Sequence, residues 1–308
     1  MPVVRLDGRA VLDVNGPDAE HLLQNIVTTD IAALPAGVAA PGALLTPQGK
    51  ILFDFLLSRT VGDGFAIECR ADIADDFARR LAMYKLRAKA EIRKREQTVV
   101  TVTWQAESAP SSEDSSASHT TSGQVQADSA PSADGSTALR DARFAERLAV
   151  RRSYAIDADA SADISEWTRL RIDNGVAESG SDYALGDSFP HDVLLDQNGG
   201  VGFRKGCFVG QEVVSRMQHR GTARRRILVA EGDADLPPAG TPVLAEGRPA
   251  GALGTVLGRH GLALVRIDKV KAAMDAGVPV TAGDVALQLS IPPGMRFTFP
   301  ETVAGEEA

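Results

Sequence analysis

Cys207 is the side chain in this sequence that is the clearest candidate for a chemical role. Gly206 and Gly210 flank it, and glycines on both sides of a residue are typical of a tight turn. Lys205 lies two residues before the cysteine, and a nearby ammonium can lower the pKa of a thiol and favour its reactive thiolate. The segment 201–221 therefore predicts a strand, a turn that carries Cys207, and then a helix. A purely structural cysteine in the turn is the alternative.

Asp54 is a carboxylate within an apolar strand. In the segment 51–56, Leu52, Asp54 and Leu56 alternate with an isoleucine and two phenylalanines, so Asp54 lies on a face that it shares with leucines. A carboxylate on such a face needs a hydrogen-bond donor or a ligand, or it stays protonated. Asp54 is therefore a candidate functional residue.

A run of basic residues surrounds Cys207. Between Arg204 and Arg226 there are seven lysines and arginines and one acid, a local charge of +6 in a chain whose net charge is −8. A charge run is usually a solvated face. Here it spans the turn and the start of a strand at Arg225 and Arg226, so an anion site is an equal alternative.

The segment around the cysteine resembles the K-G-C-[FY]-x-G-Q-E signature of the YgfZ family of folate-binding proteins, which is related to the T-protein (aminomethyltransferase) of the glycine-cleavage system. All fixed positions of that signature are present, namely Lys205, Gly206, Cys207, Phe208, Gly210, Gln211 and Glu212. The resemblance covers nearly all of the chain outside a serine-rich segment.

The resemblance also implies a folate site. Asp54 matches the position of an aspartate that contacts the reactive end of folate in the T-protein, and Asp192 matches an acid that binds the pterin. Arg171 falls in a segment like the family's R-[IL]-E-x-G, and is implied as a further folate contact. Arg225 and Arg226 match the region where an arginine pairs with the glutamate tail. The implied cofactor is tetrahydrofolate or a derivative.

The implied function is that of a folate-binding accessory protein in the assembly or repair of iron–sulfur clusters, whose client enzymes include some that modify tRNA. Cys207 would then be a redox group or a transient ligand of the cluster, and the partners would be folate and iron–sulfur client or assembly proteins. A tetrahydrofolate-dependent aminomethyltransferase is the alternative, with Asp54 orienting the reacting groups or accepting a proton.

The pattern of elements predicts an α+β fold in two parts. Residues 1–104 alternate hairpins and helices, including a hairpin at 5–14, a hairpin at 42–58 and a helix at 72–89, and with 138–221 they form an aminomethyltransferase-like region of antiparallel sheets and helices. Short strands separated by turns over 222–302 indicate a small β-barrel or sandwich, and the resemblance to the T-protein implies the C-terminal β-barrel. The segment 105–137, in which ten of 33 residues are serine, is predicted to be disordered.

Composition limits the remaining possibilities. Two cysteines suit a reducing compartment and are too few for a conventional zinc site or cluster made by this chain alone. Cys69 is expected to be packed without chemistry, and His191, beside a proline, to lie at the surface. The acidic net charge argues against direct nucleic-acid binding, and no apolar run suggests a membrane span or signal peptide. We therefore expect a cytoplasmic monomer without a metal site of its own.

Overall fold

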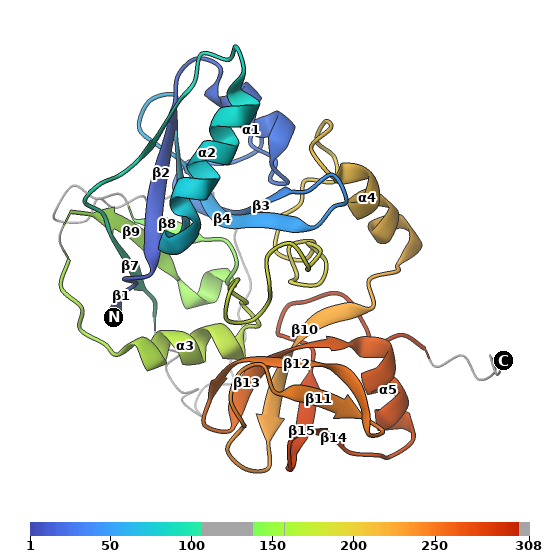
Figure 1. Cartoon of the computed structure of the whole chain (residues 1–308). Coiled ribbons are helices and arrows are strands. Elements are labelled where there is room, and N and C mark those ends of the chain that lie inside the picture. The colour runs from blue at the N-terminus through green and yellow to red at the C-terminus, as the bar shows by residue number, and fades with distance from the viewer. Residues whose placement is uncertain (106–137, 157, 302–308) are drawn as a thin grey trace, which may run out of the picture.

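A computed structural model describes residues 1–105, 138–156 and 158–301 (Figure 1). The serine-rich segment 105–137 was predicted to be disordered. It lies outside the described residues, except for its first residue. The helices are α1 (Ala19–Ile26), α2 (Ala74–Lys85), α3 (Ile164–Asp173), α4 (Gln211–Arg220) and α5 (Ile267–Asp275), with short 3-10 turns η1 (Ala71–Ile73) and η2 (Glu146–Leu148).

The N-terminal part is built on one nine-stranded sheet with the order β1-β7-β9-β8-β3-β4-β5-β2-β6. Its strands are β1 (Val3–Arg5), β2 (Arg9–Asn15), β3 (Val38–Leu45), β4 (Ile51–Arg59), β5 (Phe65–Arg70), β6 (Glu91–Lys94), β7 (Val99–Thr103), β8 (Leu139–Asp141) and β9 (Arg151–Ala155). The pairs are antiparallel except β3 with β8. The α+β class is confirmed, with one parallel pair that was not expected.

The predicted hairpin at 5–14 is wrong, although both of its strands exist. β1 pairs with β7, and β2 pairs with β5 and β6, so the two neighbours in sequence do not pair with each other. The hairpin at 42–58 is confirmed as β3 and β4, with the turn at residues 46–50. This hairpin matters most for function because the cysteine turn packs against its tip.

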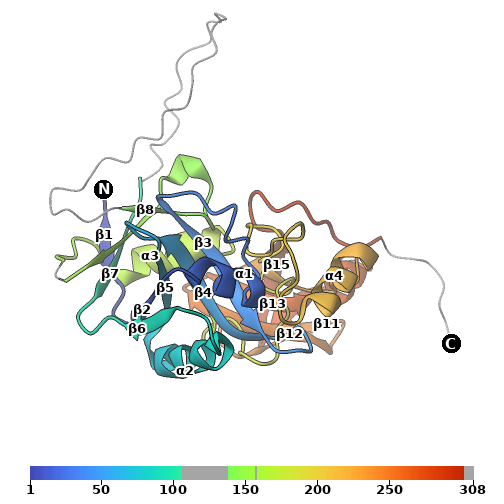
Figure 2. The same ribbon diagram turned by 90° about the horizontal axis from the view of Figure 1, so that it is seen from above.

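Helices α1 and α2 cover the same part of the sheet (Figures 1 and 2). The ring of Phe77, on α2, stacks on Phe53 and Phe55 of β4, with ring centroids 4.7 and 5.5 Å apart. Burying such aromatic side chains, each worth about 2–3 kcal/mol, fixes β4 in place. Asp54 lies between these two phenylalanines in sequence, so its side chain points to the opposite face of the strand.

A closed six-stranded barrel forms the C-terminal part, in the order β10-β13-β12-β11-β14-β15, as predicted (Figure 1). Its strands are β10 (Arg225–Gly232), β11 (Pro242–Ala245), β12 (Arg248–Leu257), β13 (His260–Arg266), β14 (Val280–Ala282) and β15 (Val285–Ser290). Valine, leucine and alanine side chains fill the barrel. The domain limits 1–104, 138–221 and 222–302 stay predictions.

Charged side chains are buried in the N-terminal part. Arg152, which is fully buried, donates to Glu68 at 2.8 Å and to Asp141 at 3.1 Å. Arg9 donates to the same Glu68 oxygen at 2.7 Å, and Arg143 donates to Asp141 at 2.7 Å. Burial alone would raise the pKa of Asp141, but Arg143 and Arg152 lower it to about 2. Five charges from four strands and a neighbouring turn thus form one network, which we call the buried ion network.

Within the described residues, no helix is both long and apolar enough to cross a membrane.

Candidate functional site

The cysteine turn is fixed by a close contact between two glycines. Gly210, which precedes α4, has a φ of +78°, and a Cβ at this position would lie 2.5 Å from the carbonyl oxygen of Thr46 and 3.1 Å from the Cα of Gly49. Gly49 also has a positive φ, of +80°, and a Cβ there would contact Val213 of α4. The start of α4 therefore docks on the β3–β4 turn at a distance that side chains do not allow.

A buried aromatic side chain anchors the other side of Cys207. Phe208 is 7% exposed and packs with the core residues Leu45, Ile51 and Val214. The exposed cysteine is thus held between a buried phenylalanine and a buried lysine. The segment 201–210, which contains it, forms turns and not the strand that the sequence predicted. The helix predicted after Gly210 is confirmed as α4.

Lys205 links the cysteine turn to the segment after α1 by hydrogen bonds. Its ammonium donates to the carbonyl oxygens of Val27 at 2.7 Å and Thr29 at 2.8 Å, and lies 5.4 Å from the ring centroid of Phe208. Burial lowers the pKa of Lys205 to about 8, although Asp30 acts in the opposite direction. The predicted role of this ammonium, activating the thiol of Cys207, therefore has no support in the geometry, because the ammonium is bound to two carbonyls.

Replacing Lys205 by methionine should loosen the cysteine turn. Two buried carbonyls would lose their donor, which costs about 2 kcal/mol in the free energy of unfolding. Urea unfolding measures this loss, and hydrogen exchange should show faster opening of residues 201–210. Lys269→Met, which removes a surface donor to the carbonyl of Pro249, is the control. Equal effects of the two substitutions would contradict the assignment.

The two cysteines differ in every respect that matters for reactivity. Cys207 is exposed, whereas Cys69 is fully buried, and burial raises the pKa of the Cys69 thiol to about 12. The prediction that Cys69 is packed is confirmed. Among the described residues, no group of three or more histidine, cysteine, aspartate or glutamate side chains could hold a metal ion.

Asp54 lines a small cavity in the centre of the N-terminal part. It accepts a hydrogen bond of 2.6 Å from the hydroxyl of Ser179. Burial raises the pKa of Tyr183 well above its usual range, and the negative charge of Asp54 raises it further. Arg9 and Glu178 also line this cavity. The donors, acids and apolar walls are of the types that a pterin requires. The volume of about 30 Å³ holds about one water molecule, so a pterin does not fit in this conformation.

Asp192 and Arg225 pair with each other. The Asp192 carboxylate is buried and accepts from the Phe189 amide at 2.9 Å and from the Arg225 guanidinium at 2.9 Å. Burial raises the pKa of Asp192, and these two donors act against that shift. Arg225 also donates to Asp187 at 2.9 Å. Both side chains thus connect the segment 187–192 to the first strand of the barrel.

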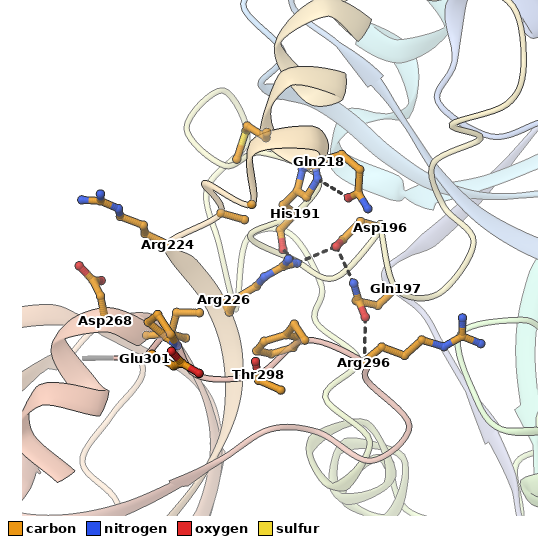
Figure 3. Close-up of a pocket in the computed structure, with 16 residues that line it drawn as sticks. His191, Asp196, Gln197, Gln218, Arg224, Arg226, Asp268, Arg296, Thr298 and Glu301 are labelled. Atoms are coloured by element: carbon orange, nitrogen blue, oxygen red, sulfur yellow. Dashed lines mark hydrogen bonds and ion pairs between the residues drawn. The ribbon is translucent and has the colours of Figure 1, made fainter. Parts of the chain in front are cut away.

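Arg226 lies at an open groove between α4, the barrel and the segment 296–301 (Figure 3). Its guanidinium donates to the His191 carbonyl at 2.7 Å and to Asp196 at 2.6 Å, and its Cζ lies 4.8 Å from the ring centroid of Phe297. The groove has a volume of about 1020 Å³.

His191, predicted at the surface, is buried. Its Nε2 lies 3.1 Å from Oε1 of Gln218, and burial lowers its pKa. The prediction failed because the segment after Pro190 is covered by α4, which sequence proximity does not reveal.

Arg171 connects three parts of the structure by hydrogen bonds. It is buried on α3 and donates to the Val176 carbonyl at 2.9 Å, to Asp182 at 3.1 Å and to the Thr255 hydroxyl of the barrel at 3.3 Å. These bonds use the donors that were predicted to contact folate. Two further motif residues make local contacts near the turn. Gln211 accepts a hydrogen bond from the Phe208 amide at 3.4 Å, and exposed Glu212 forms an ion pair with Arg216.

The predicted site residues do not share one cavity. Asp54 lines the central cavity and Arg226 lines the groove at α4, while Cys207 lies on the surface outside both. Asp54 and Arg226, which the resemblance implied for one folate site, therefore line two different cavities in this structure. Sequence reasoning also missed Ser179 and Tyr183, which surround Asp54 from a segment with no recognisable motif.

Comparisons with known proteins place this geometry in context. Residues 224–297 match the family described as CAF17, C-terminal beta-barrel domain. The chain is 29% identical to the protein named "Iron-sulfur cluster assembly factor IBA57, mitochondrial" from Homo sapiens, over 94% of this chain and 83% of that protein. It is also 29% identical to the protein of the same name from Mus musculus, over 87% of this chain and 78% of that protein.

The fold is shared with a solved enzyme. The glycine cleavage system aminomethyltransferase T from Bartonella henselae superposes with a TM-score of 0.65 at 16% identity, covering 95% of this chain and 86% of that one. The expected aminomethyltransferase-type fold is confirmed. These relatives carry the name IBA57 and not YgfZ. The comparisons therefore support similarity to iron–sulfur cluster assembly factors and not to the YgfZ family in particular.

The expected cytoplasmic location is contradicted. The relatives from Homo sapiens, Mus musculus and Pyricularia oryzae are all named as mitochondrial proteins. The expectation rested on the absence of an apolar leader at the start of the chain, and that absence does not decide the compartment.

Proposed function

We propose that this relative of the mitochondrial assembly factors works in the assembly of iron–sulfur clusters, and that Cys207 is the residue that contacts the cluster. The observation that supports this most is an exposed thiol on a turn that is fixed from three directions, by the Gly210–Gly49 contact, by Phe208 and by Lys205. A side chain on a rigid, exposed turn can reach a partner without a cost for ordering the turn.

The cluster in this proposal is shared between two molecules. Iron–sulfur clusters take about four protein ligands, and Cys207 is the one exposed cysteine of the chain. The protein partner therefore supplies the remaining ligands, and the cluster is the cargo of both. Cys69 is excluded as a second ligand because it is fully buried.

Replacing Cys207 by alanine should abolish this function and leave the fold intact. In cells that lack their own copy of the protein, the wild type should restore the activity of iron–sulfur enzymes, while the Cys207→Ala variant should restore less than about a tenth of it, because the loss of one ligand weakens a cluster site strongly. The Cys69→Ala variant is the control and should restore nearly full activity.

The stability of each variant must be measured beside its activity. Because Cys207 is exposed, Cys207→Ala should change the free energy of unfolding by less than about 0.5 kcal/mol. Full restoration of enzyme activity by this variant would contradict the proposal. Purified wild-type protein given ferrous iron and sulfide alone should hold no stable cluster, since only one of the two cysteines of the chain is exposed.

We also propose that the protein binds a folate as an accessory property, as the resemblance to the YgfZ family implies. The shared fold and the side chains around Asp54 support this idea, and the closed volume of about 30 Å³ opposes it. Binding at Asp54 would require the segment 175–183, which carries Ser179 and Tyr183, to move away from β4. The roles of Asp192, Arg171, Arg225 and Arg226 as folate contacts, and the tRNA-modifying clients, remain predictions.

Calorimetry with tetrahydrofolate tests the folate proposal. Wild-type protein should bind it, and Asp54→Asn should weaken binding by about tenfold, since the variant loses a charged acceptor. Arg226→Ala distinguishes the two cavities, because a larger effect there would place the ligand in the groove at α4. No binding by the wild type would remove folate from the proposal. Turnover with an aminomethylated lipoyl carrier that depends on Asp54 would instead favour the aminomethyltransferase alternative.

A further inference from the structure

The segment around Cys207 carries several exposed basic side chains. Helix α4 buries Val214, and Arg216, His219 and Arg220 lie on its opposite, exposed face. Arg204, three residues before the cysteine, is exposed as well. We call these four residues and Cys207 the basic surface, and α4, which carries most of it, lies at the rim of the molecule in both views (Figures 1 and 2).

The one acid of α4 is already paired. Glu212 accepts from Arg216 at 2.6 Å. Among the described residues, no carboxylate lies within ion-pair distance of Arg204 or Arg220. The basic surface therefore keeps uncompensated positive charge in a chain whose net charge is −8.

Arg224 is left out of this surface. It lines the groove of Figure 3 together with Asp268 and Glu301. Lys205, Arg225 and Arg226 are left out too, since all three donate to internal oxygens. Of the seven basic residues in the charge run, Lys205 and Arg226 are buried and Arg225 is half-buried, while the other four are exposed. Of those four, only Arg224 lines the groove.

We propose that Cys207 is approached by a protein whose contact face is acidic, and that the basic surface selects and orients that partner. This inference rests on the proposed function, in which the partner supplies the other cluster ligands. A cluster held by thiolates is itself anionic, so the same charges favour both the partner and its cargo. Nucleic acid is also anionic, but it supplies no thiolates.

The dimensions suit one contact face. Helix α4 has ten residues and is about 15 Å long, which is short beside the width of the roughly 800 Å² that one partner contributes to an ordinary interface. Exposed charges at the rim of such an interface change the association rate and its salt dependence more than they change affinity. The rate of reaction at Cys207 is therefore the quantity to measure.

Two synthetic peptides of equal length serve as probes. Each carries one cysteine as a mixed disulfide with thiopyridine, flanked by glutamates in one peptide and by lysines in the other. The Cys207 thiolate attacks the peptide sulfur, forms a protein–peptide disulfide and releases thiopyridone, so no external oxidant is needed. At low ionic strength the glutamate peptide should react about tenfold faster than the lysine peptide, and the ratio should approach one at about 1 M salt.

The double variant Arg204→Glu/Arg220→Glu should invert the preference of wild-type protein. The matched control is Arg87→Glu/Arg248→Glu, which makes the same change in net charge at two exposed arginines outside the basic surface. The control should keep most of the preference for the glutamate peptide. An unfolded variant is recognised by reaction of Cys69, which stays protected in folded protein.

Three results would overturn the proposal: equal rates for the two peptides in wild-type protein, an equal effect of the control variant, or tight binding of single-stranded RNA that the Arg204→Glu/Arg220→Glu variant loses. The outcome is independent of the proposed function, because the probes contain no cluster. If Cys207 is essential in cells and the peptides react equally, the charge selection fails and the function stands. If the glutamate peptide is preferred and Cys207→Ala is fully active in cells, the proposed function fails.

Discussion

Gly210→Ala should destabilise the protein by about 3 kcal/mol. The backbone φ of +78° costs a residue with a Cβ about 1–2 kcal/mol. The new methyl group would also lie 2.5 Å from the Thr46 carbonyl oxygen and 3.1 Å from the Cα of Gly49. Both neighbours are backbone atoms, so they cannot rotate away, and such overpacking costs about 1–3 kcal/mol more. Urea unfolding measures the change.

Gly206→Ala is the matched control for this prediction. Gly206 belongs to the same turn, but a Cβ there has no atom within 4 Å and its φ is not positive. We therefore expect a change below about 0.5 kcal/mol. If the proposed function holds, Gly210→Ala should also lower the restoration of iron–sulfur enzymes, since it displaces the turn that carries Cys207. Equal stability of the two variants would show that the contact between α4 and the β3–β4 turn is not what fixes the turn.

The contrast between these glycines shows what sequence could predict about the site. The motif indicated a glycine-bounded turn before a helix, and the structure has both. It could not indicate that Gly210 meets Gly49, because that contact joins residues far apart in the chain. Lys205 gives a similar contrast, since proximity in sequence suggested Cys207 as its partner and the fold places two carbonyl oxygens on its ammonium. Its effect on the thiol stays a prediction.

The fold was more predictable than the cavities. The alternation of residues along β4, the turn between β3 and β4, and the turns between the barrel strands are local signals, and they gave the right elements. The pairing of β1 with β7 depends on closing a long loop, and no local signal reports it. Cavities depend on how several such long-range contacts meet, so Asp54, Arg171 and Arg226 could be recognised as candidates but not assigned to one pocket.

The buried ion network is a further feature that sequence could not reveal, and it gives the second large effect. Arg152→Met should destabilise the protein by about 3 kcal/mol, because Glu68 and Asp141 would stay buried with one arginine each. Arg169→Met removes an exposed pair with Asp173, worth below about 1 kcal/mol, and is the control.

The pH dependence of this effect distinguishes lost charge pairing from lost packing. The pKa of Asp141 is about 2 in the folded protein against an ordinary value of 3.8, so the stability that its arginines provide is present above pH 4 and is lost as the pH falls toward 2. The difference in the free energy of unfolding between wild type and Arg152→Met should therefore shrink between pH 7 and pH 3. A difference that is constant over that range would mean that Arg152 acts through its volume, since packing does not titrate.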